Sequence, residues 1–217
     1  MQERRIGWRV ALAALALVAT PAAATAQSTA APGSPMERAL ESRAKGGDSA
    51  AVVVFEIADF QCPYCAQFAT SVAPAIDEKY VETGRIQWVF VNLPLHTHPL
   101  AWHAAEAALC AGVAGDRFWA MHDRLFQEQE AWTRAENPRA RFAEYAADLD
   151  VPTPAYQACV RDDQVASLIL QDLGSVVSAG VSGTPTFIIM KDNEVLEQMV
   201  GVRPLEEWSR ILDEALQ

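Results

Sequence analysis

Two cysteines separated by two residues are the side chains of this sequence with the clearest capacity for covalent chemistry. They stand in the run Cys62-Pro63-Tyr64-Cys65, which follows a valine-rich segment and opens a predicted helix. A thiol at a helix start meets free backbone N–H groups and the positive end of the helix dipole, which favour its thiolate form. We therefore expect thiol–disulfide exchange, with Cys62 as nucleophile and Cys65 buried one turn into the helix.

The Cys-x-x-Cys pattern also occurs in zinc sites and in inert structural disulfides. A zinc site of this kind needs a second close cysteine pair. The other two cysteines, Cys110 and Cys159, lie far apart in the sequence. An inert disulfide would not need a place where a strand passes into a helix. The sequence therefore favours a reactive pair, and we expect no metal ligands.

Three further residues could serve this chemistry. Glu56 lies six residues before Cys62 in the predicted strand, where a buried acid could accept and return the Cys65 proton; the alternative is an exposed acid at the strand end. Pro185 follows Thr184 just before another predicted strand, and taken alone it indicates an ordinary turn. Asp59 could tune the charge of Cys62 or could be solvated, and the sequence leaves both open.

The elements that would position these residues indicate an α/β fold. The residue patterns predict four short strands, at residues 51–57, 86–91, 186–190 and 195–200. They predict helices at residues 62–82 and 204–216, and Lys191-Asp192-Asn193 forms the predicted hairpin turn. Residues 100–178 are rich in alanine and predict four or five helices. The first strand–helix–strand unit is expected to give a parallel strand pair.

This order of elements resembles a thioredoxin-like fold, in which a central mixed sheet carries an inserted all-helical subdomain. The expected thioredoxin-like domain comprises residues 49–98 and 180–217, and the inserted helical domain comprises residues 99–179. A flexible lead-in is expected over residues 27–48, and it could end in a short helix.

The first residues suggest export, and the charge balance limits the possible partners. A charged start, an apolar run at residues 10–19 and Ala24-Thr25-Ala26 predict a signal peptide at residues 1–26, with an uncleaved membrane anchor as the alternative. The formal net charge of the 217 residues is −11, which argues against nucleic acid and anionic membrane surfaces as partners.

The histidines suggest a further but weaker possibility. His96, His98 and His103 lie close together, and a His-x-His pattern could bind copper or zinc. The favoured interpretation is a solvated loop between a strand and a helix. His122 is expected to be a helix surface or packing residue.

Several segments together resemble the DsbA-like family of bacterial thiol:disulfide oxidoreductases. Residues 55–65 resemble its active-site segment, residues 181–187 its cis-proline loop, and residues 104–123 part of its inserted helical domain. The resemblance covers about residues 48–217. It implies that Cys62 is the exposed nucleophile, Cys65 the resolving cysteine and Glu56 the buried acid.

The same resemblance implies a substrate-binding surface and a second disulfide. Pro185 would be cis and lie against the reactive disulfide, and Thr184 would pair through its backbone with a bound substrate chain. Pro63 and Tyr64 would complete this surface. Cys110 and Cys159 are expected to form a structural disulfide within the helical domain; two free buried thiols or a relay to the reactive pair remain alternatives.

The predicted activity is donation of the Cys62–Cys65 disulfide to folding exported proteins through a mixed disulfide at Cys62. One alternative is a reductase or isomerase that uses the reduced dithiol, and another is a non-catalytic binding or metal-handling module of the same fold. We expect no cofactor besides the disulfide, a membrane redox partner, a monomer, and a periplasmic or otherwise extracytoplasmic location.

Overall fold

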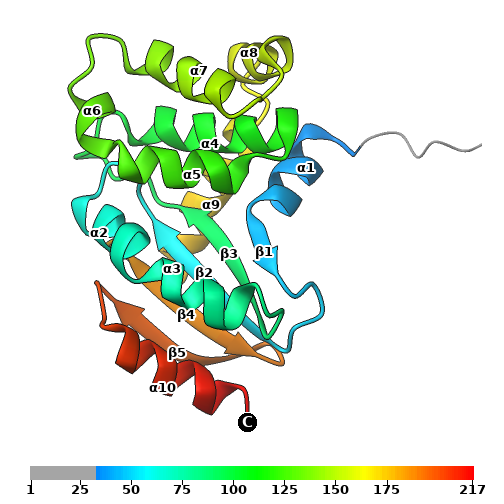
Figure 1. Cartoon of the computed structure of the whole chain (residues 1–217), viewed down its shortest axis with the longest axis vertical. Helices are drawn as coiled ribbons and strands as arrows, with labels where there is room; N and C mark the ends of the chain where they lie inside the picture. Colours follow the sequence, from blue (N-terminus) through cyan, green and yellow to red (C-terminus); the bar gives the residue numbers. More distant parts are fainter. Residues whose placement is uncertain (1–32) are drawn as a thin grey trace, which may run out of the picture. The chain divides into compact units, whose positions relative to one another are not determined.

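A five-stranded mixed sheet forms the centre of residues 33–217, which are the residues that the structure, a computed structural model, describes (Figure 1). The predicted signal peptide lies outside them. The strand order is β1-β3-β2-β4-β5; β2 and β3 are parallel, and the other neighbouring pairs are antiparallel. The strands are β1 (Ala44–Gly46), β2 (Val52–Ala58), β3 (Ile86–Asn92), β4 (Thr186–Lys191) and β5 (Glu194–Val200). The predicted thioredoxin-like sheet is therefore confirmed.

Strand β2 lies in the middle of the sheet and leads directly into the reactive turn. It pairs with β3 on one side and with β4 on the other, so its backbone is held along both edges. Its β-branched residues Val52 and Val54 are buried, as suits a central strand. The end of β2 at Ala58 is therefore a rigid starting point for the cysteine motif.

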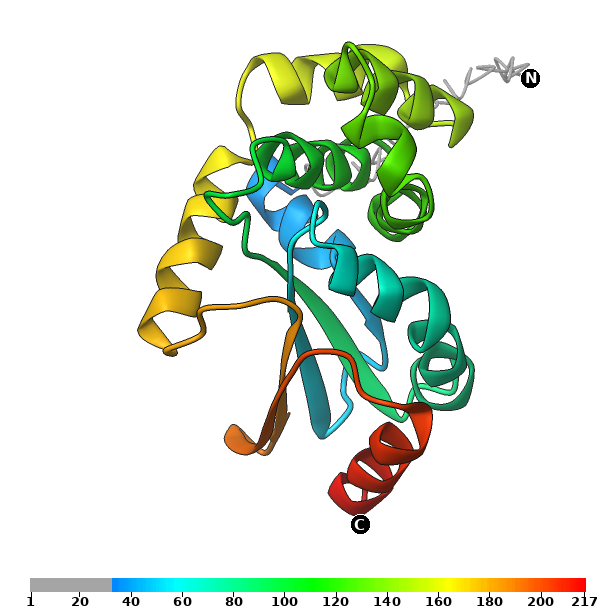
Figure 2. The same cartoon turned by 90° about the vertical axis from the view of Figure 1, so that its left-hand side faces the viewer.

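The helical connection between β2 and β3 is divided, although the sequence predicts one helix. It consists of α2 (Pro63–Ser71), α3 (Ala73–Ile76) and the π-helical turn η1 (Asp77–Val81). Val72 separates α2 from α3, and Pro74 follows with no backbone N–H to continue the hydrogen-bond ladder. These segments and α10 (Leu205–Ala215) cover one face of the sheet, and α9 (Ala166–Ser178) lies on the other (Figure 2).

The helical insertion contains six helices between Ala101 and Ser178, where the sequence predicts four or five. Besides α9 these are α4 (Ala101–Gly115), α5 (Phe118–Gln127), α6 (Gln129–Thr133), α7 (Pro138–Asp148) and α8 (Thr153–Arg161). Helix α4 is buried along most of its length, since its alanines let neighbouring helices approach closely. A disulfide joins Cys110 on α4 to Cys159 on α8.

The described part of the lead-in expected at residues 27–48 is ordered: it contains the short helix that the sequence suggested at residues 36–43, and a strand follows it where a flexible segment was expected. Ser34 and Glu37 form a capping box that starts α1 (Pro35–Ser42), and β1 then pairs with β3. Helix α1 packs on α4 at Gly112, where an added Cβ would overlap the side chain of Ser42. The sheet therefore begins at Ala44, before the expected boundary at residue 49.

A buried ion pair holds this segment to the helical insertion. Both carboxylate oxygens of Asp172 on α9 accept hydrogen bonds from Arg43 Nη1, at 2.7 and 2.6 Å. The backbone N–H and side-chain amide of Asn92 donate to the same carboxylate, at 3.0 and 2.9 Å. One carboxylate thereby joins the end of α1, the end of β3 and α9.

Candidate active site

The turn from β2 into α2 places Cys62 at the helix N-cap. Its backbone is extended (φ −74°, ψ 124°), and Pro63 occupies the first turn of α2. The Cys62 N–H donates to the carbonyl of Asp59 at 3.0 Å, which closes the turn. No side chain caps the helix, so the sulfur of Cys62 lies where the free N–H groups of the first turn converge.

This position separates the pKa values of the two thiols. Interactions with the Cys65 thiol, with Thr184 and with the backbone N–H groups of Cys65 and Tyr64 lower the pKa of Cys62 from 9.0 to about 5, against the opposing effect of burial. Burial, the hydrogen bond to Cys62 and repulsion by its thiolate raise the pKa of Cys65 well above its ordinary value. Near neutral pH the arrangement therefore favours the thiolate at Cys62 and the protonated thiol at Cys65.

The nucleophile is less exposed than expected. The exposed fraction of Cys62 is 4%, and that of Cys65 is 0%. The physical reason is the loop before β4, since Cys62 Sγ lies 3.5 Å from the Thr184 carbonyl oxygen. Tyr64, between the two cysteines, is 64% exposed. Tyr64 is therefore the exposed side chain of the motif, whereas both cysteines are covered.

The loop that covers Cys62 contains the cis peptide bond Thr184–Pro185. The Pro185 carbonyl accepts a hydrogen bond at 2.8 Å from Gly201, which follows β5. Thr186 Oγ1 donates to the Gly183 carbonyl, also at 2.8 Å. These bonds fix the loop beside the cysteines, with Thr184 in contact with Cys62; the substrate-binding role that the resemblance implies for Thr184 stays a prediction.

Glu56 is buried with an exposed fraction of 2%, not exposed at a strand end. Trp88 Nε1 donates to its Oε2 at 2.8 Å, and its Oε1 has no hydrogen-bond partner among the described residues. Burial raises the pKa of Glu56, although His122, Trp88 and Lys45 oppose this effect. Glu56 therefore remains an acid that can carry a proton at higher pH than a surface glutamate.

His122 is buried on α5 and packs among aromatic rings, including Phe60 and Trp119. His122 was expected to be either a surface residue of a helix or a packing residue, and it is a packing residue. His122 and Glu56 line a cavity of about 350 Å³ between the sheet and α5. Three lining residues each carry a buried polar atom with no protein partner among the described residues, namely Glu56 Oε1, His122 Nε2 and Trp119 Nε1. A cavity of this size and polarity accommodates water beside Glu56.

Asp59 has a role that the sequence left open. Its buried carboxylate accepts from the backbone N–H groups of Gln61 at 2.6 Å and Leu95 at 2.8 Å. The same carboxylate lies 2.8 Å from His98 Nδ1. Asp59 thus binds the loop after β3 to the reactive turn, and His98 is part of that contact.

Two glutamines that sequence reasoning missed also hold the reactive turn. Gln61 Oε1 accepts from the Leu100 N–H at 2.8 Å. Gln129 Nε2 on α6 donates to the carbonyls of Phe60 at 2.7 Å and Cys62 at 3.0 Å. No sequence signal marks Gln129, because its distance along the chain from the cysteines hides the contact.

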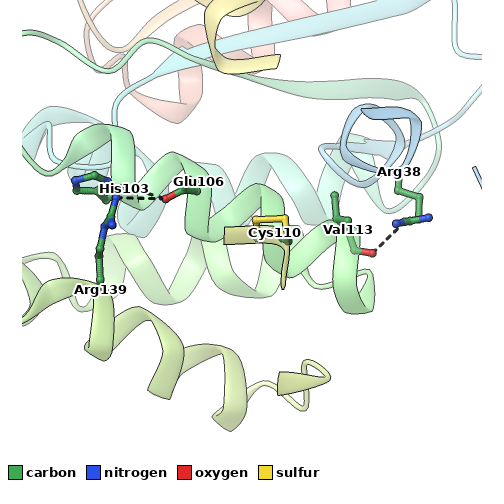
Figure 3. Close-up of a disulfide and its surroundings, with 7 residues drawn as sticks. Arg38, His103, Glu106, Cys110, Val113 and Arg139 are labelled. Atoms are coloured by element: carbon green, nitrogen blue, oxygen red, sulfur yellow. Dashed lines mark hydrogen bonds and ion pairs between the residues drawn. A yellow bond between two sulfur atoms is a disulfide. The ribbon is translucent and has the colours of Figure 1, made fainter. Parts of the chain in front are cut away.

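A polar group of three side chains lies to one side of the Cys110–Cys159 disulfide, toward the start of α4 (Figure 3). Glu106, one turn before Cys110, is buried, and burial raises its pKa while Arg139 opposes the effect. Arg139 lies 3.9 Å from the Glu106 carboxylate and His103 lies 4.0 Å from it. His103 is therefore separated from His98 and takes part in a different contact.

Residues 33–217 contain no group of three His, Cys, Asp or Glu side chains placed to hold a metal ion. No helix in this described range has the length and apolar character needed to cross a membrane.

Comparison with known proteins places residues 39–214 on the family model described as Thioredoxin. The chain is 38% identical over 146 residues to Na(+)/H(+) antiporter NhaA 3 of Salinispora tropica, which covers 67% of this chain and 21% of that protein, so the chain spans about a fifth of that relative. It is 27% identical over 159 residues to "Probable disulfide bond formation protein D" of Bacillus cereus, covering 67% of this chain and 74% of that protein.

Among solved structures, alpha-DsbA1 of Wolbachia pipientis is similar with a TM-score of 0.71 at 22% identity. The match covers 80% of this chain and 90% of that one. At this level of identity the similarity concerns the fold.

Proposed function

We propose a thiol–disulfide oxidoreductase that donates disulfides, on the premise that this chain belongs to the thioredoxin family, in which it is DsbA-like. The observation that carries the proposal is the unequal pair of thiols at the start of α2. The pKa of Cys62 is lowered to about 5, and the pKa of Cys65 is raised. This asymmetry suits a site that exchanges one thiol with a partner and keeps the other inside.

The proposed reaction proceeds in two exchanges. A substrate thiolate attacks Cys62 Sγ in the Cys62–Cys65 disulfide, the bond between the two sulfurs breaks, and Cys65 leaves and takes up a proton. A second substrate thiolate then attacks the substrate sulfur of the mixed disulfide, and Cys62 leaves as a thiolate. The substrate loses two electrons, which reduce the enzyme to a dithiol, and Glu56 is the proposed proton carrier for Cys65.

The lowered pKa supports the oxidising direction. At pH 7 a thiol with a pKa of about 5 gains about 2.7 kcal/mol as thiolate, because each pKa unit corresponds to about 1.4 kcal/mol. This gain stabilises the reduced enzyme. It makes the disulfide more oxidising by roughly 60 mV than a pair with ordinary thiols, at about 30 mV per 1.4 kcal/mol.

The setting proposed for this reaction is extracytoplasmic, with reduced or misoxidised exported proteins as substrates and a membrane protein that reoxidises the dithiol. The functional chain is proposed to be a monomer that uses no cofactor besides the reactive disulfide. The name of the Bacillus cereus relative refers to disulfide bond formation, which supports substrates that acquire disulfides.

The direction of exchange is tested by equilibrating the purified protein with glutathione buffers and trapping the thiols. An oxidising potential for Cys62–Cys65 supports the donor, whereas a reducing, thioredoxin-like potential would replace it with the reductase or isomerase. A Cys62 that reacts at no glutathione ratio would leave only a non-catalytic binding module. Cys62→Ser is the control, since it removes the reactive sulfur and leaves the buried Cys110–Cys159 disulfide in place.

A further inference from the structure

A cavity of about 520 Å³ lies beside the reactive turn, between α2 and the loop that joins β5 to α10. Helix α2 contributes one wall, the cis-proline loop contributes Thr184, and the β5–α10 loop contributes the opposite wall. The residues that line this cavity include Tyr64, Gln67, Thr184, Gly201 and Arg203.

This cavity adjoins the reacting sulfur. Thr184 lines it and also contacts Cys62, whose Sγ is 3.5 Å from the Thr184 carbonyl. Tyr64 lines it from between the two cysteines. The hydrogen bond from Gly201 N–H to the Pro185 carbonyl joins the opposite wall to the cis-proline loop. A polypeptide linked to Cys62 would therefore have a neighbouring side chain in or beside this cavity.

The cavity has one charged side chain, and its charge is positive. Of the residues that line it, only Arg203 is ionised, and no carboxylate is among them. Within residues 33–217, no carboxylate lies within ion-pair distance of Arg203, although Glu206 and Glu207 follow closely in the first turn of α10. In contrast, a net charge of −11 means that acidic groups predominate in the chain.

We propose that Arg203 makes this cavity a specificity pocket for an aspartate or glutamate side chain close to the reacting cysteine of a substrate. The inference rests on the proposed function, because it concerns the substrates of the same site. A carboxylate in the pocket meets a cation that has no competing partner there, together with the polar side chain of Gln67. The partner is an extended acidic segment around a cysteine, and Thr184 and Tyr64 flank its backbone.

The net charge of the protein alone would predict a preference for basic peptides, the opposite of the preference proposed for Arg203. At a distance, a chain of charge −11 repels an acidic peptide, but salt at physiological strength screens charges beyond about 8 Å. A carboxylate in contact with Arg203 is screened less. Arg203 is exposed, and an exposed ion pair changes an equilibrium by up to about fivefold, so we expect an acidic peptide to react about two- to fivefold faster than its amide counterpart.

The test uses the oxidised full chain and dithiol peptides that differ in one residue, either glutamate or glutamine, placed in turn at each of the three positions on either side of the first cysteine. Reduction of Cys62–Cys65 is followed by acid quenching and thiol alkylation at physiological salt. The quantity compared is the ratio of the glutamate rate to the glutamine rate within each variant. Arg203→Gln removes the cation, Arg203→Glu reverses it, and Arg203→Lys retains it.

The matched control is Lys191→Gln, which removes one positive charge at the end of β4 remote from the cis-proline loop. We expect a ratio above two in the wild type, in Lys191→Gln and in Arg203→Lys at one position or more. We expect a ratio near one in Arg203→Gln and below one in Arg203→Glu. Equal rates for both peptides in the wild type, or a ratio that survives Arg203→Glu, would overturn the inference.

Dithiothreitol separates this outcome from failure of the proposed function. If dithiothreitol reduces Cys62–Cys65 and the peptides react without regard to charge, the oxidoreductase remains and the specificity pocket is wrong. If no dithiol reduces the pair, both proposals fail together.

Discussion

Replacing Cys65 by alanine should raise the pKa of Cys62, because the Cys65 thiol is the largest single cause of its lowered value. The substitution removes the S–H donor but leaves the backbone N–H groups of Tyr64 and residue 65 at the start of α2. The contact between Cys62 and Thr184 also remains. The pKa should therefore rise from about 5 without reaching the ordinary 9.0.

The size of the rise follows from the strength of a hydrogen bond to a charged group. Such a bond contributes about 1.5–3 kcal/mol, and a pKa unit corresponds to about 1.4 kcal/mol. We therefore expect the pKa of Cys62 in Cys65→Ala to be about one to two units higher. The variant Cys65→Ser is the matched control, since its hydroxyl can donate in place of the thiol and should keep the pKa closer to that of the wild type.

The assay is a pH titration of the ultraviolet absorbance of the Cys62 thiolate in the reduced wild type and both variants, with iodoacetamide alkylation rates as a second measure. A shared pKa in wild type and Cys65→Ala would refute the assignment of the thiol as main donor. A similar rise in Cys65→Ser would indicate that the packing of the sulfur, not its hydrogen bond, sets the value.

Three other perturbations test the surroundings of the site. The pKa of Glu56 is raised in the folded state, so the protonated carboxyl contributes its full stability below about pH 4.5, and this contribution is lost as the pH rises. The free energy of unfolding of Glu56→Gln, measured with urea, should therefore increase relative to that of the wild type between pH 4 and pH 8. Asp172→Ala leaves Arg43 as an unpaired buried charge and should lower the free energy of unfolding by about 3–5 kcal/mol. Replacing Cys110 and Cys159 together by alanine removes a buried disulfide and should cost about 2–5 kcal/mol, read from the urea midpoint of the oxidised protein.

Each of these results has a counterpart that would contradict it. If the free energies of unfolding of Glu56→Gln and wild type differ by a constant amount from pH 4 to pH 8, the Glu56 carboxyl does not titrate in that range. Unchanged stability of Asp172→Ala would show that water reaches Arg43. For the disulfide variant, Cys62 should keep its low pKa, because the bridge lies in the helical insertion; a shifted value would show that the insertion sets the geometry of the turn.

The reactive pair could be predicted from the sequence because its chemistry depends on neighbouring residues. Cys62, Pro63 and Cys65 lie within one helical turn, so the N-cap position and the burial of the second thiol follow from local spacing. The strand before them is apolar enough to predict that it is buried. Here local pattern and tertiary packing agree.

The contacts that hold the turn could not be predicted, since they join distant parts of the chain. Gln129 reaches the Cys62 carbonyl from α6, and nothing in the residues near it indicates that partner. Asp59 was ambiguous for the same reason, because its partners Leu95 and His98 follow β3. Strand β1 has three residues and no hydrophobic pattern of its own, so only its pairing with β3 reveals it.

The buried position of the Cys110–Cys159 disulfide determines when this bond can form during folding. Both cysteines are inaccessible to solvent in the folded helical insertion, so neither glutathione nor the thiolate of another copy can attack the bridge there. The bridge must consequently be made while the helices are still open. If the proposed function holds, each newly made molecule must itself acquire a disulfide during folding before it can donate disulfides to other proteins. Once it has folded, its buried Cys110–Cys159 disulfide is protected from the exchange reaction at Cys62.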